Sequence, residues 1–255
     1  MLSEQQIINY KADKNLLQNN VILITGAGDG IGKTTAMAYA EVGAQLILAG
    51  RTLAKLEQVY DNIVAAGHTE PTLYPIDLEG ATDEDYEQLA VEINQQFGRL
   101  DGLLHNAGIL GQRTPLSNYR SDVWDRVMKV NITAQFQMTQ ALMPVLEKSP
   151  AASVLFTSSG VGRVGRAFWG AYAVSKFAVE GLVQTWASEL EGLNGVRINC
   201  INPGATATSM RAQAYPAENP QNIATPQQIM PAYLYLMGAD SIGVNGQSVN
   251  AQLVK

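Results

Sequence analysis

Short apolar runs alternate with longer amphipathic segments along the whole chain. Each run spans only a few residues and is bounded by glycine, proline or polar residues, which is typical of buried parallel strands. Strands are predicted at residues 21–24, 44–49, 72–76, 101–105, 153–157, 196–201 and 246–251. Helices are predicted between them, at about 33–41, 53–66, 83–97, 121–146, 169–191 and 226–237.

This alternation predicts an α/β fold. Consecutive parallel strands joined by helices require right-handed crossovers, so the helices must cover both faces of one parallel sheet. No shift in composition divides the chain, and we expect a single three-layer αβα domain over residues 1–255, with residues 1–19 as an N-terminal extension. Ligands of such sheets bind beyond the carboxyl ends of the strands.

Composition argues against several classes of protein. The net charge of the 255-residue chain is −6, which disfavours sequence-independent binding of nucleic acid. No apolar run approaches the roughly 20 residues of a membrane span, and the polar N-terminus lacks the apolar core of a signal peptide. These features predict a cytoplasmic protein with neither nucleic-acid nor membrane partners.

Cysteine and histidine are too sparse to suggest a disulfide or a metal centre. The single cysteine, Cys200, excludes an internal disulfide, and its apolar surroundings favour a buried hydrophobe over a reactive thiol. The two histidines, His68 and His105, are too far from other potential ligands to indicate a metal site.

A glycine-rich segment at residues 25–32, Thr-Gly-Ala-Gly-Asp-Gly-Ile-Gly, joins the first predicted strand to the first predicted helix. Gly26 allows a tight turn, and Gly32 lets the helix pack closely against the sheet. Gly28 and Gly30 let the backbone approach a pyrophosphate, to which the helix start offers N–H groups and a positive dipole. Such a turn can also be merely a tight loop, but its place between strand and helix favours phosphate binding.

Candidate acid–base chemistry lies on the predicted helix 169–191. Tyr172 and Lys176 are four residues apart and therefore share one helix face. A nearby ammonium lowers the pKa of a phenol, normally about 10, so such a tyrosine can exchange protons near neutral pH. Ser159 ends the fifth strand and would face the same crevice, although the adjacent Ser158 leaves that choice resting on spacing. Alone, these residues could be an exposed pair and a turn serine; together with the glycine segment they indicate a catalytic set.

The chain resembles the short-chain dehydrogenases/reductases over nearly its whole length, and the wording of its motifs resembles the YciK-like bacterial subgroup. This resemblance implies a Rossmann-type, doubly wound sheet with strand order 3-2-1-4-5-6-7. His105 departs from the family, which commonly has asparagine there, and strand-end packing would explain it. The matching motifs are the glycine segment, Asn106-Ala107-Gly108, Asn131, Ser159, Tyr172 with Lys176, and Asn202-Pro203-Gly204 with Thr206.

The family implies a role for each matching residue. Tyr172 would exchange a proton with the substrate oxygen, and Lys176 would hold the nicotinamide ribose and lower the pKa of Tyr172. Ser159 would polarise the carbonyl, and Asn131 would hold a water in a proton relay through Lys176. The implied cofactor-binding residues are Gly26, Gly28, Asp29, Gly30, Ile31, Gly32, Arg51, Asp77, Leu78, Asn106, Ala107, Gly108, Tyr172, Lys176, Pro203, Gly204 and Thr206.

The end of the second predicted strand favours NADP(H) over NAD(H). Enzymes that select NAD usually place a carboxylate there, whereas this strand ends at Gly50 and Arg51. Gly50 leaves room for a 2′-phosphate, and the Arg51 guanidinium could grip it with two hydrogen bonds. Arg51 could instead be a solvated turn residue, and Asp29 weakens the case slightly. Asp77 is expected to serve the adenine ring.

These features predict an NADP(H)-dependent oxidoreductase that transfers hydride between the nicotinamide and a small-molecule carbonyl or secondary alcohol. One alternative is a non-catalytic NAD(P)-binding regulatory protein on the same fold, which would have no need of the intact Ser159, Tyr172 and Lys176 set. Another is an epimerase or dehydratase on a related extended fold, which chain length and the glycine spacing disfavour.

Two loops and two helices carry the remaining expectations. Residues 205–225 would form a substrate lid, with Met210, Arg211 and Tyr215 as candidate contacts. Arg163 and Arg166 could receive an anionic substrate group or make surface or subunit contacts. The two long helices are apolar on more than one face, which, with the family's habit, predicts a homodimer or homotetramer. The residues concerned are Val127, Val130, Ile132, Phe136, Leu142, Phe177, Val179, Leu182, Val183 and Trp186.

Overall fold

The computed structural model describes residues 2–192 and 195–253. Across these residues, seven parallel strands form one sheet in the order β3-β2-β1-β4-β5-β6-β7. This arrangement confirms the predicted Rossmann-type fold and its strand order. The strands are β1 Val21–Thr25, β2 Gln45–Gly50, β3 Thr72–Pro75, β4 Gly102–His105, β5 Ser153–Thr157, β6 Arg197–Asn202 and β7 Ser248–Asn250.

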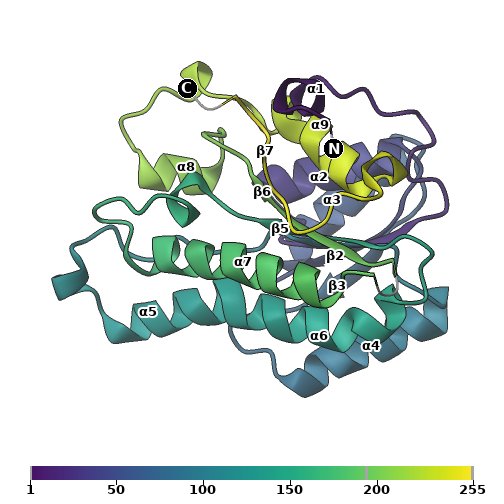
Figure 1. The fold of residues 1–255 in the computed structure, drawn as a ribbon, viewed down its shortest axis with the longest axis horizontal. Coiled ribbons are helices and arrows are strands. Elements are labelled where there is room, and N and C mark those ends of the chain that lie inside the picture. The colour runs from purple at the N-terminus through teal and green to yellow at the C-terminus, as the bar shows by residue number, and fades with distance from the viewer. Residues whose placement is uncertain (1, 193–194, 254–255) are drawn as a thin grey trace.

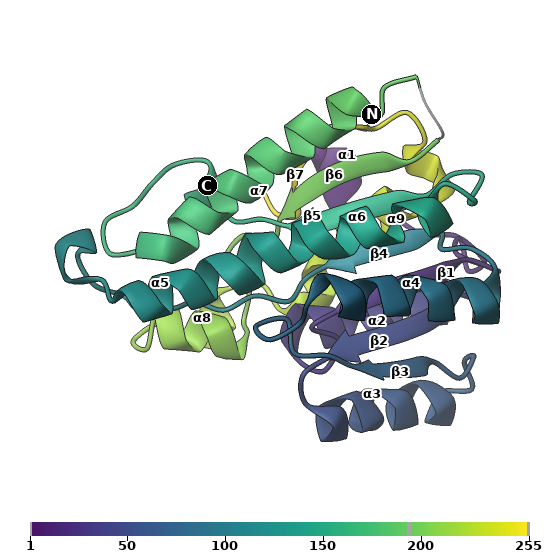
Figure 2. The same cartoon turned by 90° about the horizontal axis from the view of Figure 1, so that it is seen from below.

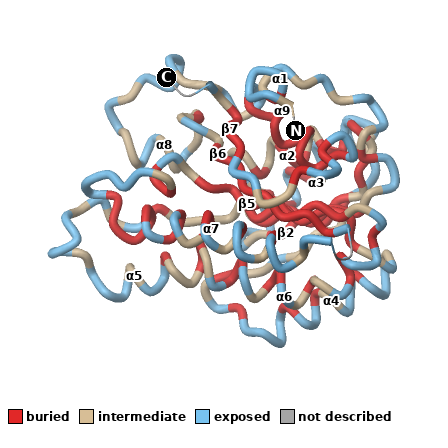
Figure 3. Tube along the Cα trace, viewed as in Figure 1, coloured by how far each residue is buried: buried red, intermediate tan, exposed pale blue. Residues whose placement is uncertain are grey.

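Helices cover both faces of the sheet, as Figures 1 and 2 show. One face carries α2 (Gly30–Glu41), α3 (Leu53–Ala65) and α9 (Met230–Met237), and the other carries α4 (Asp83–Phe97), α6 (Ala134–Leu146) and α7 (Gly170–Glu189). Side chains of β1 alternate between the two cores: Ile22 packs with Tyr39 of α2, and Leu23 packs with Met138 of α6. The central strands β1, β4 and β5 are consequently buried on both faces (Figure 3).

The predicted helix at 121–146 is interrupted in the middle. It consists of α5 (Ser121–Met128), a π-helical segment (Lys129–Thr133) and α6, with Pro144 inside α6. A π-helical turn changes the direction in which the following side chains point, and such turns are frequent at functional sites. The segment contains Asn131, one of the residues predicted to act in catalysis.

The N-terminal extension is an integral part of the domain. It contains a short helix, α1 (Glu4–Ile8), whose start is closed by a capping box of Ser3 and Gln6. Ile7 and Leu17 are buried in the core beneath α9. The polar composition of residues 1–19 concealed these apolar contacts.

The predicted lid segment is only partly a loop. It contains α8 (Ser209–Ala214), which begins at Thr208, whose side chain accepts a hydrogen bond from the Arg211 N–H. An isolated bridge between Thr206 and Ala224 closes the segment at its base. The segment 226–237 also divides, into a 3₁₀ turn at Pro226–Ile229 and then α9.

Candidate active site

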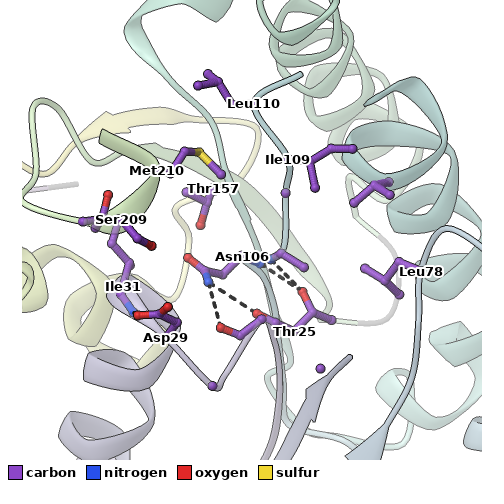
Figure 4. Close-up of a pocket in the computed structure, with 18 of the residues that line it drawn as sticks. Thr25, Asp29, Ile31, Leu78, Asn106, Ile109, Leu110, Thr157, Ser209 and Met210 are labelled. Atoms are coloured by element: carbon purple, nitrogen blue, oxygen red, sulfur yellow. Dashed lines mark hydrogen bonds between the residues drawn. The ribbon is translucent and has the colours of Figure 1, made fainter. Parts of the chain in front are cut away.

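A cavity of about 610 Å³ opens beyond the carboxyl ends of the central strands. Its walls come from the loops after β1, β2, β3, β4, β5 and β6 and from the starts of α2, α3, α7 and α8. Its lining includes all of the predicted catalytic and cofactor-binding residues except Gly32 and Asn131. Of the candidate lid contacts, Met210 and Arg211 line it and Tyr215 does not. In Figure 4, Asp29 and Thr25 lie toward one end of the cavity, and Leu110 and Met210 lie toward the other.

Close backbone contacts shape the glycine-rich loop. Gly26 has a positive φ of 66°, and a Cβ there would lie 2.9 Å from the Cα of Ala107. A Cβ on Gly32 would lie 2.2 Å from the Gly26 carbonyl oxygen, so Gly32 supports the loop from behind and does not line the cavity. The remaining surface of the loop is bare backbone at the start of α2, which suits an anion.

The Asn-Ala-Gly segment after β4 is fastened to this loop by Thr25. The Thr25 hydroxyl donates to the Leu104 carbonyl and accepts hydrogen bonds from the N–H groups of Asn106 and Ala107, both at 3.1 Å. The Asn106 side chain donates to the carbonyls of Thr25 and Gly26, as the dashed lines in Figure 4 show. Hydrogen bonds therefore hold the glycine-rich loop after β1 and the Asn-Ala-Gly segment after β4 together.

Two positively charged residues lie at the junction of β2 and α3, next to Asp29 from the loop after β1. Arg51 lines the cavity beside Gly50, as predicted. Lys55, in the first turn of α3, also lines it and lies 2.8 Å from the Asp29 carboxylate. Asp29 in turn caps α2 by accepting a hydrogen bond from the Gly30 N–H. Lys55 escaped prediction, although a lysine one turn into the helix after Arg51 was a readable signal.

Ser159, Tyr172 and Lys176 all line the cavity. Ser159 follows β5, and its side chain is hydrogen-bonded with the Tyr172 phenol. The Lys176 ammonium is 5.7 Å from the centroid of the Tyr172 ring and donates to the Thr157 carbonyl at 2.7 Å. Strand β5 and helix α7 therefore bring the three side chains together.

The pKa of Tyr172 contradicts one expectation. Burial raises the pKa of Tyr172 above 10, and the hydrogen bond with Ser159 only partly opposes this. Lys176 was predicted to lower that pKa, but burial lowers the pKa of Lys176 itself to about 8, against the opposing effect of Cys200 and Glu180. Tyr172 is consequently protonated at neutral pH, the form that donates a proton.

The neighbouring Ser158 has a different environment from Ser159. Ser158 is buried, and its hydroxyl donates to the Glu180 carboxylate at 2.5 Å. Glu180 also accepts from Arg163 at 3.3 Å and from the Cys200 thiol at 3.2 Å. Both serines line the cavity, but the Ser158 hydroxyl is bound to Glu180, whereas Ser159 is the serine beside the Tyr172 phenol. Ser159 therefore stays the predicted catalytic serine.

Arg163 points away from the cavity into the same network. It donates to Glu180 and to the side chains of Ser248 and Asn250 on β7. Arg166 is exposed, and neither arginine lines the cavity. Arg163 therefore links α7 to β7 through hydrogen bonds. Neither arginine contacts the cavity.

Asn131 lies just behind the cavity and is fully buried. Its side-chain oxygen accepts from the Ile109 N–H at 2.8 Å, and its amide donates to the Ile109 carbonyl and to Ser175. Because the side chain is engaged with protein groups, a water held by this residue would have to bind its backbone carbonyl.

An apolar cluster lines the cavity beside Tyr172. Leu110, Trp169 and Tyr172 form a third hydrophobic cluster, against which Met210 and Ala214 of α8 pack. Met210 was named as a candidate, whereas Leu110 and Ala214 escaped prediction because no motif marks them. The cluster therefore brings together the predicted lid, α7 and the loop after β4 beside Tyr172.

His105 and Cys200 have structural roles. His105 stacks on Phe156 at 4.6 Å and bonds to Thr139, and burial lowers the pKa of His105 to about 3, which keeps the ring neutral. Burial raises the pKa of the Cys200 thiol to about 12, so it is unreactive. Residues 2–192 and 195–253 contain no cluster of three or more potential metal ligands. None of the helices described over those ranges combines the length and the apolar character of a membrane span.

Known proteins share both the sequence and this geometry. A family model described as short chain dehydrogenase matches residues 20–219. The uncharacterized oxidoreductase YciK of Escherichia coli strain K12 is 50% identical over 245 residues, which cover 96% of each chain. A structure described as a short chain dehydrogenase from Pseudomonas syringae is 57% identical, with a TM-score of 0.94 over 95% of this chain and 98% of that one. Another, from Shigella flexneri 2a and described as complexed with NADP, is 50% identical, with a TM-score of 0.92 over 94% of this chain and 100% of that one. The chain therefore belongs to the short-chain dehydrogenase/reductase family, within which it resembles the YciK group of oxidoreductases.

Proposed function

We propose that this oxidoreductase uses NADP(H) to interconvert a small carbonyl compound and its secondary alcohol. The observation that carries the proposal is the meeting of Ser159, Tyr172 and Lys176 in one cavity with the glycine-rich loop. A nucleotide site without catalysis would require only the loop. The proposal therefore rests on the reactive side chains being placed where a bound nicotinamide would end.

The residues present fit a dinucleotide. The loop offers bare backbone and a helix start to the pyrophosphate, because Gly26 and Gly32 leave no room for side chains behind it. Arg51 and Lys55 offer positive charge to a 2′-phosphate beside Gly50. The surface pair of Lys55 with Asp29 is more than half exposed and therefore weak, so Lys55 can turn to a phosphate. The NADP complex of the Shigella flexneri relative supports the same choice of cofactor.

The chemistry assigned to the chain is proton transfer and orientation. The Ser159 hydroxyl would donate to the substrate carbonyl oxygen, and Tyr172 would deliver the proton to that oxygen. The Lys176 ammonium would stabilise the phenolate left on Tyr172 and would hold the ribose hydroxyls. When bound, the nicotinamide supplies the hydride. The backbone carbonyl of Asn131 would hold the water that returns a proton toward Lys176.

The proposal is tested with a panel of aldehydes and ketones and NADPH deuterated at the transferable position. We expect NADPH absorbance to fall with at least one panel member and the deuterium to appear on the carbinol carbon. Tight NADPH binding with no turnover across the panel would favour a nucleotide-binding regulatory protein instead.

A further inference from the structure

We propose that the substrate is an uncharged carbonyl compound with an apolar body, and that Trp169 is the residue that selects it. This inference rests on the proposed carbonyl oxidoreductase activity and names the substrate class of the same site. It depends on which side chains form the cavity wall beside Tyr172, and on which protein groups bind the nearby arginines.

The apolar side chains of this wall come from three separate segments. Leu110 comes from the loop after β4, Trp169 from the start of α7, and Met210 and Ala214 from α8. The other α8 residues that line the cavity are Ser209, Arg211 and Gln213. Leu110 and Trp169 are 8% and 7% exposed, so the wall is a built part of the interior. The Trp169 ring centroid lies 5.5 Å from that of Tyr172, so the indole packs beside the proposed proton donor.

The backbone around Trp169 is arranged to hold the indole inward. Phe168 has a φ of 70°, which is uncommon for a bulky residue, and Gly170 has a φ of 41°. A Cβ on Gly170 would lie 2.3 Å from the Tyr119 ring, so only glycine fits that position. The turn leaves Phe168 54% exposed while Trp169 is buried. A strained turn with this outcome is typical of a functional position.

The two arginines near the wall are already paired with protein groups: Arg113 does not line the cavity, and Arg211 lines it but is bound to Glu218. The Arg113 guanidinium lies 4.3 Å from the centroid of Trp169 and donates to the Ala214 carbonyl at 2.9 Å. Arg211 makes two hydrogen bonds of 2.6 Å with Glu218 and stacks on Tyr215 at 3.8 Å. These contacts fasten α8 over the cavity and use the charges that an anionic substrate would need. The acidic side chains that line the cavity, Asp29 and Asp77, belong to the loops after β1 and β3, with the predicted cofactor site.

A charged substrate body would therefore lose its hydration against this wall without gaining a partner. The test compares two aldehydes of similar shape, methyl 4-formylbenzoate and 4-formylbenzoate, with the NADPH-loaded protein. We expect kcat/KM to be at least about tenfold higher for the ester, because burial of an unpaired carboxylate is unfavourable. An equal or higher kcat/KM for the carboxylate would overturn the inference and leave the oxidoreductase proposal standing.

Two variants and a matched control assign the selectivity to the wall. Trp169→Ala should raise KM for the ester about tenfold, with less effect on propanal, which is too small to cover the wall. Phe168→Ala, at the exposed neighbouring ring, should leave both substrates unaffected. Because Trp169→Ala could disturb folding, Met210→Lys provides a second test: it should lower kcat/KM for the ester and raise it for the carboxylate. An unchanged ester-to-carboxylate ratio in Met210→Lys would contradict the assignment.

Binding separates this inference from the proposed activity if neither aldehyde is reduced. The ester should then still quench the fluorescence of Trp169 in the NADPH complex more strongly than the carboxylate, with Trp169→Phe as the control that removes the signal. Stronger quenching by the carboxylate would refute the apolar site, whereas a complete absence of turnover would refute only the reductase proposal.

Discussion

Burial shifts the pKa values of the reactive side chains in this site more than their contacts with one another do. Tyr172 lies within hydrogen-bonding contact of Ser159, yet burial raises the pKa of its phenol. Lys176 is equally buried, and its pKa falls to about 8. The motif selected side chains that line one cavity. The direction of the Tyr172 shift could not be read from spacing, because desolvation depends on packing that a motif does not encode.

The buried Glu180 carboxylate should control the pH range of the reaction. Below about pH 8 Lys176 carries its charge, and the negative charge of Glu180 favours that form. In Glu180→Gln this support is lost, so the pKa of Lys176 falls and the ammonium is lost at lower pH. We therefore expect the alkaline limb of kcat/KM for carbonyl reduction to move to lower pH. Glu189→Gln, at an exposed position of the same helix, should leave the profile in place. A profile in Glu180→Gln identical to that of wild type would refute this role.

Arg51 and Lys55 should determine the choice of cofactor. NADPH is expected to bind more tightly than NADH by on the order of 2 kcal/mol if one of them makes a charge-assisted contact with the 2′-phosphate. Arg51→Ala should remove most of that preference and barely change NADH binding, and Lys55→Ala should remove part of it. The exposed Arg166, outside the cavity, gives a matched control in Arg166→Ala. Equal affinities of wild type for the two cofactors, measured by fluorescence titration, would contradict the assignment.

Helices and strands were predictable where a local sequence pattern marks their beginning and end. The strand β5 was predicted at its observed bounds, and α4 begins after Thr82 as expected, with three acidic residues in its first turn and Gly98 at its end. Helix α1 was missed although Ser3 and Gln6 form a capping box, which is a local signal. The π-helical segment at Lys129–Thr133 was not predictable, because no local pattern marks it and only its packing in the fold favours it. The same limit applies to Leu110 and Ala214, which reach the cavity only through the fold.

The packing of α2 against the loop after β1 gives a prediction at the level of elements. A methyl group on Gly32 would meet the Gly26 carbonyl oxygen at 2.2 Å, so loop and helix would have to separate. Gly32→Ala should lower the free energy of unfolding by about 1–3 kcal/mol and weaken NADPH binding. Gly181→Ala, in α7 with nothing near the new methyl group, should instead raise stability by about 0.5–1 kcal/mol. Urea denaturation of both variants decides the matter, and an unchanged stability of Gly32→Ala would contradict this packing argument.

At the scale of the whole molecule, the predicted apolar helix faces divide into two groups. Leu142 and Val183 are buried in the core against the sheet, and Val127 of α5 is also buried within the chain. Phe136 and Phe177 remain 39% and 44% exposed, on α6 and α7. The core explains the first group, and the second group is the candidate contact surface for a second copy.

We therefore expect a homodimer or homotetramer that uses the outer faces of α6 and α7. Phe177→Glu should lower the molar mass at micromolar concentration, because it would place a charge in the two-fold contact. Leu116→Glu changes a residue that is 64% exposed and lies on neither helix, so it should have no such effect. Light scattering provides the measurement, and a monomeric mass for the wild type would refute the predicted assembly.

The proton donor is the central claim, and Tyr172→Phe tests it most directly. The change removes the transferable proton and keeps the ring that packs against Trp169. With a carbonyl substrate that the wild type reduces, kcat should fall by about 10²–10⁴-fold, the usual contribution of general acid catalysis. The dissociation constant for NADPH, titrated in the same preparation, should stay close to that of the wild type. Near wild-type turnover in Tyr172→Phe would contradict the mechanism.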